Sequence, residues 1–339
     1  MTTVSKSPRS GVLRGLSIAL LWLALVLMTV WAAAALYVDV RTPSLRLPLT
    51  AFYVAGAIAA LVLTSWRRAV AAWAAGFVIV LAWWLTLQPS NEGPWNPNLD
   101  RTAWAGVSGD AITIHNLRNC EYRTEDEYHN CWSDRTLHLS KLQAMDFTLT
   151  TWGPKFIGHP IMTFDFGGEG HVAFSIEVRY RPGQSYSALL GFFRQFTLIF
   201  VAADERDVLR LRTNYRQGEN VFLYRTALTP ELARKVFLTY IGYLNQLHER
   251  PEWYNALTRN CTTALNQQIA TDMPDPRGFS IQLVFNGTLD ELLYSRGRLV
   301  TGGLPFPALK AQALVNTAAK AADSFPDFSA RIRAGRVGF

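Results

Sequence analysis

The apolar residues of this chain are concentrated at its beginning. Three long apolar runs fill the first 87 residues, at positions 16–38, 49–66 and 69–87. Each run is close to the roughly 20 residues that an α-helix needs to cross the hydrocarbon core of a bilayer. None has the polar face that a helix at the surface of a soluble protein would carry. We therefore predict three transmembrane helices that anchor the rest of the chain.

Basic residues near these runs predict how the anchor is oriented. Five basic side chains precede the first run or separate the second from the third: Lys6, Arg9, Arg14, Arg67 and Arg68. Arg41 and Arg46 lie in the opposite loop and weaken this bias. Because basic loops stay in the cytoplasm, we place the N-terminus there and everything after residue 87 outside. We expect a multi-pass protein of a bacterial inner membrane with a periplasmic domain.

The rest of the chain reads as one α+β domain after a linker. Residues 88–109 include a stretch rich in Pro and Gly, which marks a domain boundary. Residues 110–339 mix alternating apolar segments with helical ones, so we predict an antiparallel sheet packed on helices, with a helical tail. The expected strands are 111–115, 119–123, 131–139, 145–152, two arms around 167–170, 196–202 and 221–225. The expected helices are 187–194, 204–215, 229–249, 289–293 and 307–322, and segment 327–333 shows no distinctive pattern.

A hairpin supplies the candidate base. Two alternating apolar runs flank the turn Gly-Gly-Glu-Gly at 167–170. Folding about this turn places residues whose numbers sum to about 336 side by side, so His159 faces Glu177 and His171 faces Asp165. A carboxylate beside a histidine fixes its tautomer and raises its basicity. We assign His159 as the base and Glu177 as its orienting group. A slip of one residue would separate them, and the alternative is a surface histidine near a chance glutamate.

Cys261 is the candidate nucleophile. Asn260 is a preferred N-cap residue, and a helix-like run begins at Thr262. A thiol in the first turn of a helix meets the positive end of the helix dipole, which favours the thiolate. Backbone N–H groups at the same helix start, around Asn260 and Thr262, would hold an oxyanion. The alternative is an inert buried cysteine.

The other two cysteines, Cys120 and Cys131, flank the charged turn at 125–128. Across a hairpin they would face each other, and an oxidising compartment would favour a disulfide between them. That bond would leave Cys261 as the single free thiol. Two unpaired cysteines are the alternative.

Arginines cluster just before the strand at 221–225. Arg210, Arg212 and Arg216, together with Asn214 and Tyr215, form a candidate substrate-binding segment, because guanidinium groups hold phosphate by paired hydrogen bonds. A solvated helix end is the alternative. The net charge of +7 comes from dispersed arginines, without the basic stripe expected of a nucleic-acid-binding protein. No CxxC, P-loop, HExxH, GxSxG or GxGxxG motif is present, and we expect neither a metal nor a cofactor.

The order of these residues suggests a family. A histidine on a strand pair that precedes an Asn-Cys helix start resembles the circularly permuted papain-like group, which includes the lecithin:retinol acyltransferase relatives. Over roughly residues 110–335 the chain more closely resembles the Lnb N-terminal periplasmic domain family. The matching stretches are Ile-Thr-Ile-His-Asn-Leu-Arg-Asn at 112–119, Asp-Glu-Arg-Asp at 204–207, Leu-Arg-Thr-Asn-Tyr at 211–215 and Asn-Cys-Thr-Thr at 260–263. The cysteine pair at 120 and 131 is a departure from the family.

The resemblance implies an acyltransferase that acts on lipoproteins or on a related substrate. An acyl chain would pass from a phospholipid to Cys261 as a thioester and then to an amine, with His159 and Glu177 assisting. A papain-like hydrolase that cleaves cell-wall or peptide substrates would use the same residues and is the first alternative. A non-enzymatic membrane scaffold is the second.

Overall fold

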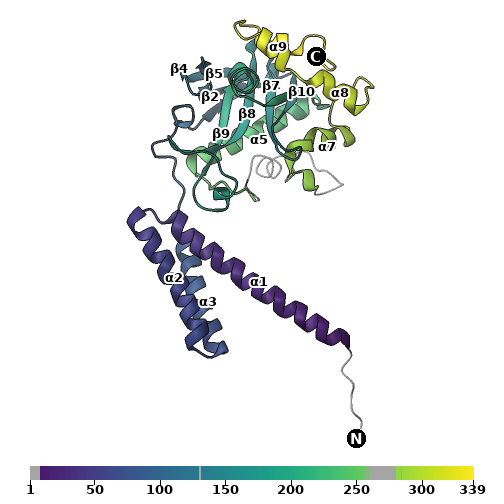
Figure 1. Cartoon of the computed structure of the whole chain (residues 1–339). Coiled ribbons are helices and arrows are strands. Elements are labelled where there is room, and N and C mark those ends of the chain that lie inside the picture. The colour runs from purple at the N-terminus through teal and green to yellow at the C-terminus, as the bar shows by residue number, and fades with distance from the viewer. Residues whose placement is uncertain (1–7, 130, 257, 260–279, 284) are drawn as a thin grey trace. The chain divides into compact units, whose positions relative to one another are not determined.

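The computed structural model describes residues 8–129, 131–256, 258–259, 280–283 and 285–339 (Figure 1). The chain divides into two compact units. The first comprises Met1–Gln88 with Phe193–Gln195, and the second comprises Pro89–Phe192 with Phe196–Phe339. Residues Asn260, Cys261 and Thr262 lie outside the described part of the chain.

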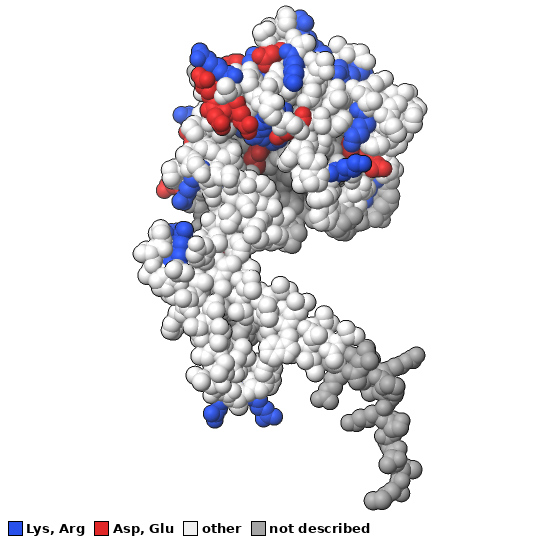
Figure 2. All heavy atoms as spheres, in the orientation of Figure 1, with Lys and Arg blue, Asp and Glu red and all other residues white. Residues whose placement is uncertain are grey.

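Three apolar helices form the first unit: α1 (Pro8–Asp39), α2 (Pro43–Leu63) and α3 (Trp66–Thr86). All three are long and apolar enough to cross a membrane. Few of their side chains are buried against each other, and Figure 2 shows their surface almost without charge between the helix ends. An apolar surface of this kind suits lipid rather than water, and the predicted three apolar helices of membrane-spanning length are confirmed.

The bounds of the second helix differ from the prediction. It begins at Pro43, six residues before the apolar run, because a proline fits the first turn of a helix without losing a hydrogen bond. It ends at Leu63, and Trp66 opens α3 with Ser65 as its N-cap.

An antiparallel sheet organises the second unit. Its strands follow the order β1-β2-β9-β8-β7-β6-β10, and β5 pairs with β2. The pairing of β2 with β9 is parallel and the others are antiparallel. The strands are β1 (Trp104–Ser108), β2 (Ala111–Arg118), β5 (Trp132–His138), β6 (Ala144–Thr151), β7 (Gly158–Asp165), β8 (His171–Arg179), β9 (Thr197–Asp204) and β10 (Asn220–Arg225). The predicted α+β class is confirmed, and β1 lies inside the segment expected to be a linker.

Helices cover both faces of the sheet (Figure 1). On one face α5 (Pro230–Glu249) packs Phe237 and Tyr240 against Phe164 and Phe174. The Thr229 hydroxyl caps this helix by accepting from the N–H of Leu232, as its sequence predicts. The other face buries smaller side chains under α4 (Glu205–Arg210), α9 (Asn316–Ala321) and α10 (Phe328–Arg333). The remaining elements are a π-helix (Leu211–Tyr215), α7 (Leu289–Ser295), α8 (Phe306–Ala313) and short 3₁₀ turns, Pro97–Leu99, Leu139–Lys141, Gly167–Glu169, Leu190–Phe192, Ile281–Leu283 and Asn286–Thr288.

Three predicted elements are wrong or incomplete. Segment 187–194 forms turns and one 3₁₀ turn rather than a helix, because its backbone bonds the passing segment at Ala256. The helix predicted over 307–322 breaks into α8 and α9, because Val315 donates to the carbonyl of Val221 at the edge of β10. Segment 327–333, which looked featureless, contains α10 and buries both Phe328 and Ile332.

A short hairpin stands beside the main sheet. It pairs β3 (Glu121–Tyr122) with β4 (Tyr128–His129), and the flanking residues Cys120 and Cys131 form the disulfide expected from the sequence.

Candidate functional site

The β7–β8 hairpin has the register that the sequence predicts. The structure pairs Met162 with Phe174 and Asp165 with His171, so opposing residue numbers sum to 336. The nitrogen Nε2 of His171 lies 3.5 Å from Asp165 Oδ1, near the turn. Toward the other end of the hairpin, the same register brings His159 next to Glu177.

A serine stands between these two residues. The nitrogen Nε2 of His159 lies 2.7 Å from Ser175 Oγ, and Ser175 Oγ donates to Glu177 Oε1 over 2.7 Å. The direct separation of His159 Nε2 and Glu177 Oε1 is 3.4 Å. His159 is only 7% exposed, so these contacts form in a largely dry environment. Ser175 and Glu177 share a sheet face because side chains alternate along a strand.

This hydrogen-bond chain determines the tautomer of the histidine. An ionised carboxylate can only accept, so the single proton of the Ser175 hydroxyl goes to Glu177. The hydroxyl oxygen must then accept from the N–H at Nε2 of His159. In the neutral ring the lone pair therefore lies on Nδ1, which is the nitrogen able to take a proton. The expected pairing of His159 with Glu177 is thus present, but through Ser175.

Arg212 contacts the same oxygen of the Glu177 carboxylate as Ser175. Its Nη2 donates to Glu177 Oε1 over 3.0 Å, and its Nη1 donates to Glu219 over 3.2 Å. Burial alone would raise the pKa of Glu177, but the charges of His159 and Arg212 lower it well below its ordinary value. Arg212 itself is buried and belongs to the π-helix Leu211–Tyr215, a distortion that is frequent at functional sites.

The arginines expected to bind phosphate are engaged with carboxylates of the protein itself. Arg210 pairs with Glu121 at 3.0 Å and with Asp323 at 2.7 Å, and Arg216 pairs with Glu125 at 3.0 Å. Asn214 and Tyr215 also hydrogen-bond the Asp323 carboxylate. The structure thus gives this segment internal partners, and its role in binding substrate stays a prediction.

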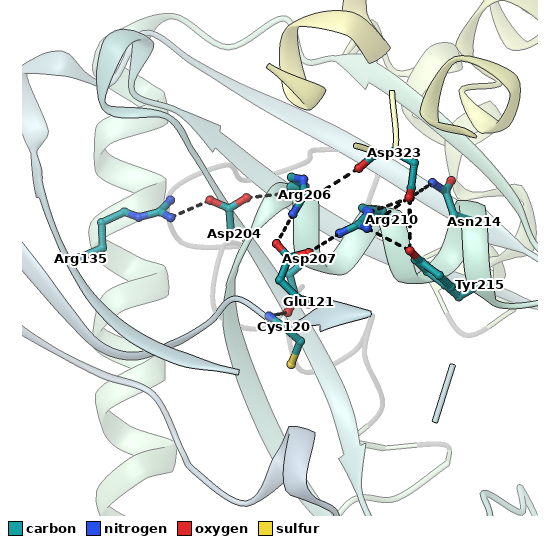
Figure 3. A network of polar contacts seen from close by, with 10 residues as sticks. All are labelled: Cys120, Glu121, Arg135, Asp204, Arg206, Asp207, Arg210, Asn214, Tyr215 and Asp323. Atoms are coloured by element: carbon teal, nitrogen blue, oxygen red, sulfur yellow. Dashed lines mark hydrogen bonds and ion pairs between the residues drawn. The ribbon is translucent and has the colours of Figure 1, made fainter. Parts of the chain in front are cut away.

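Polar residues of two sequence motifs meet in a buried network. Arg118, from the first motif, pairs with Asp207, from the second, at 2.9 Å, and both side chains are buried. The Asp207 carboxylate also accepts from the backbone N–H of Cys120. Figure 3 shows Glu121 of the same hairpin between Arg206 and Arg210. These contacts fix the disulfide hairpin to the helical segment that carries Arg212.

A small polar cavity adjoins Glu177. Its lining includes the side chains of Glu177, Arg118, Arg212, Arg216 and Tyr180. Cations therefore lie around this cavity beside the carboxylate, which favours its ionised form. Among the described residues, no group of His, Cys, Asp and Glu has the arrangement of a metal site.

The described segments on either side of Cys261 approach this part of the sheet. Before it, the N–H of Tyr254 donates to the carbonyl of Phe196, next to the first residue of β9. After it, Asn286 Oδ1 accepts from the N–H of Gly158, the neighbour of His159 in β7. The chain therefore enters and leaves the Cys261 segment beside the strand ends that carry His159 and Glu177.

Sequence reasoning missed Ser175. It sits two positions before Glu177 on the same face of β8, so strand alternation was the available signal, but a serine in an apolar strand has no distinctive pattern. The contact between Arg212 and Glu177 was not visible at all, because it joins residues 35 positions apart through a π-helix.

Comparison with known proteins supports the family suggested by the sequence. Residues 128–280 match the family model described as the Lnb N-terminal periplasmic domain. The matched region contains His159, Ser175, Glu177, Arg212 and Cys261. No curated protein and no solved structure matches the chain.

Proposed function

We propose, from the match of residues 128–280 to the Lnb N-terminal periplasmic domain family model, that the protein is a membrane-anchored cysteine acyltransferase. It would move an acyl chain from a phospholipid to Cys261 and then to an amine, with the N-terminal amine of a lipoprotein as the expected acceptor. The three apolar helices would hold it as a multi-pass protein in a bacterial inner membrane, with the domain in the periplasm. The observation that carries this proposal is the hydrogen-bonded chain of His159, Ser175, Glu177 and Arg212.

In the first half-reaction the base activates the thiol. Nδ1 of His159 takes the proton of Cys261, and Glu177, reached through Ser175, stabilises the imidazolium that results. The thiolate attacks the ester carbonyl of the phospholipid, and the tetrahedral intermediate expels the lysophospholipid alkoxide. The imidazolium returns its proton to that leaving oxygen, and the acyl chain remains on sulfur as a thioester.

In the second half-reaction the same groups act again, with Cys261 now the leaving group and the amine the nucleophile. A neutral amine attacks the thioester carbonyl, and His159 takes the proton that the nitrogen loses. The Cys261 thiolate leaves and the amide is released. The ionised state of Glu177 serves both halves, because a negative charge near the ring is needed each time the imidazolium forms.

Trapping the acyl-enzyme would test this proposal. The full-length protein is incubated in vesicles with a phospholipid that carries an isotope-labelled acyl chain, and the Cys261 peptide is examined by mass spectrometry. We expect the mass of the acyl chain on Cys261 in the wild type, its absence in Cys261→Ser, and slower formation in His159→Ala by about 10²- to 10⁴-fold. Adding an amine-bearing lipopeptide should move the label onto that peptide.

The same experiment separates the alternatives. The hydrolase alternative, which acts on cell-wall or peptide substrates, predicts that no label reaches the lipopeptide and that the protein releases fragments from wall material or peptides. A wild-type protein that never acquires label would contradict acyl transfer from phospholipid. The scaffold alternative further predicts that Cys261→Ser changes no property of the cell.

A further inference from the structure

Exposed apolar side chains gather at the end of the sheet that carries His159. In the second unit, the described residues include twelve large apolar side chains that are exposed, and half of them lie in the loops at this end. We call these six the apolar rim: Trp152, Phe156, Tyr186, Leu189, Phe192 and Phe285. Leu189 is 70% exposed, Phe156 54% and Phe285 49%.

Strand pairing places these loops at one end. Thr151, the last residue of β6, pairs with Gly158, the first residue of β7, so loop 152–157 closes this end of the two strands. Arg179, the last residue of β8, pairs with Thr197, the first residue of β9, so the connection 180–196 closes the same end next to it. Since β7 pairs with β8, the two loops are neighbours at the same end of the sheet.

The third loop joins the first directly. The N–H of Gly287 donates to the carbonyl of Phe156 over 3.2 Å, and the rings of Phe156 and Phe285 meet edge-on with centroids 6.0 Å apart. Both rings are exposed, and Phe156 lies three positions before His159 in the chain. A clustered apolar surface of this kind marks a binding site more often than an accident of sequence.

The linker shows which surface lies within reach. Arg179 at the end of β8 donates to the backbone carbonyl and side chain of Asn91, and also to the carbonyls of Leu99 and Asp100. The third apolar helix ends at Thr86. Five peptide steps of at most about 3.6 Å each therefore separate a helix of membrane-spanning length from this end of the sheet. A bilayer that holds this helix would therefore have its surface within reach of this end of the sheet.

The composition of the loops fits such a surface. Segments 152–157, 180–192 and 285–288 contain Lys155 and Arg181 and no Asp or Glu. Aromatic side chains prefer the interfacial zone of a bilayer, and basic side chains are attracted by anionic lipid headgroups. Both features would be expected of loops that rest on lipid.

We propose that the apolar rim sits in the interfacial zone of the bilayer that holds the three apolar helices. The end of the sheet with His159 then faces the lipid, and an acyl chain reaches the site without crossing water. This contact depends on the surface alone and would persist if the protein had no acyltransferase activity.

Depth-sensitive quenching would test the contact in the full-length protein. Phe156→Cys is made in a Cys261→Ser background, since Cys120 and Cys131 are joined to each other, and labelled with an environment-sensitive fluorophore. The control is Lys141→Cys, an exposed residue in the turn that precedes β6 at the opposite end of the sheet. Both proteins are placed in vesicles of phosphatidylethanolamine and phosphatidylglycerol, with nitroxide-labelled acyl chains or with aqueous iodide as the quencher.

We expect the label at position 156 to be quenched by the nitroxide lipids and protected from iodide, with the reverse at position 141. Equal access of iodide to both labels would overturn the proposal. Protection from iodide without quenching by lipid would also overturn it, because it would mean that protein covers the rim. Phe285→Cys should repeat the result for Phe156→Cys, and unchanged thermal unfolding of both variants would show that the substitutions leave the domain folded.

Discussion

Removing the guanidinium of Arg333 should destabilise the second unit strongly. Its Nη1 and Nη2 each lie 2.6 Å from an oxygen of Glu205, and Nη2 also lies 2.6 Å from Asp146. The Arg333 side chain is 7% exposed and both carboxylates are 0% exposed. The variant Arg333→Met keeps the length of the side chain and removes its charge, which leaves Glu205 without its main cationic partner. Asp146 keeps a second cation, Arg225, at 2.8 Å.

The size of the stability loss follows from the burial of Arg333 and its two carboxylate partners. Breaking a buried ion pair by removing one partner costs about 3–5 kcal/mol, because the other charge is left uncompensated. For a domain of this size, each kcal/mol lowers the melting temperature by about 2–4 °C. We therefore expect Arg333→Met to melt roughly 6–20 °C below the wild type at neutral pH.

The pH dependence of this stability loss provides a second, independent test of the buried ion pairs. Burial alone would raise the pKa of Glu205, but Arg333 lowers it from its ordinary value of 4.5 to about 2. A lowered pKa contributes stability that is complete above the unfolded value and is lost as the pH falls toward the folded one. This contribution is about 3 kcal/mol. Without Arg333 burial dominates and the shift reverses, so the deficit of the variant should shrink as the medium is acidified below about pH 5.

Thermal unfolding followed by intrinsic fluorescence at several pH values would measure both effects. The matched control is Arg331→Met in the same helix, whose partner is the exposed Asp327, and it should leave the melting temperature unchanged. If Arg333→Met melts within the error of Arg331→Met, or if its deficit grows as the pH falls, the assignment of a buried, charge-balanced cluster is refuted.

Three further outcomes follow from the structure. Ser175→Ala should slow acyl transfer about 10- to 100-fold with little change in KM, because it removes the relay to a charged group; an unchanged rate would show that His159 bonds Glu177 directly. Replacing both Cys120 and Cys131 by Ser should cost about 2–4 kcal/mol in an unfolding assay, and a reducing agent should lower the melting temperature of the wild type but not of the variant. Gly287→Ala should impair folding or transfer, because the new Cβ would collide with the backbone of loop 152–157, whereas Gly168→Ala, which meets nothing nearby, should be silent in both assays.

Local patterns predicted those parts of the fold that local physics determines. The Gly-rich turn and the alternation on either side of it were enough for the register that brings His159 to Glu177. The capping threonine and proline at 229–230 were enough for the start of α5. Both signals act over a few residues, so no knowledge of the rest of the chain was needed.

The elements that sequence reasoning missed depend on distant partners. The six residues of α10 look polar, but Phe328 and Ile332 fill the sheet face, and Arg333 reaches carboxylates 128 and 187 positions away. The break between α8 and α9 is made by the edge of β10. Tertiary contacts override local propensity in both places. Arg210 and Arg216 likewise pair with carboxylates that are distant in the sequence, which a local pattern cannot predict.

The attachment of Asn91 to Arg179 has a practical meaning for anyone who wants the periplasmic domain without its anchor. A fragment that begins at Trp104, the first residue of β1, would lack the carbonyls of Leu99 and Asp100 that accept from Arg179. The Arg179 guanidinium is buried and would then be left without these hydrogen-bond partners. A fragment that begins at Pro89 instead retains all of these acceptors of Arg179, including Asn91. Residues 89–103, which look like a spacer in the sequence, are better treated as part of the domain itself.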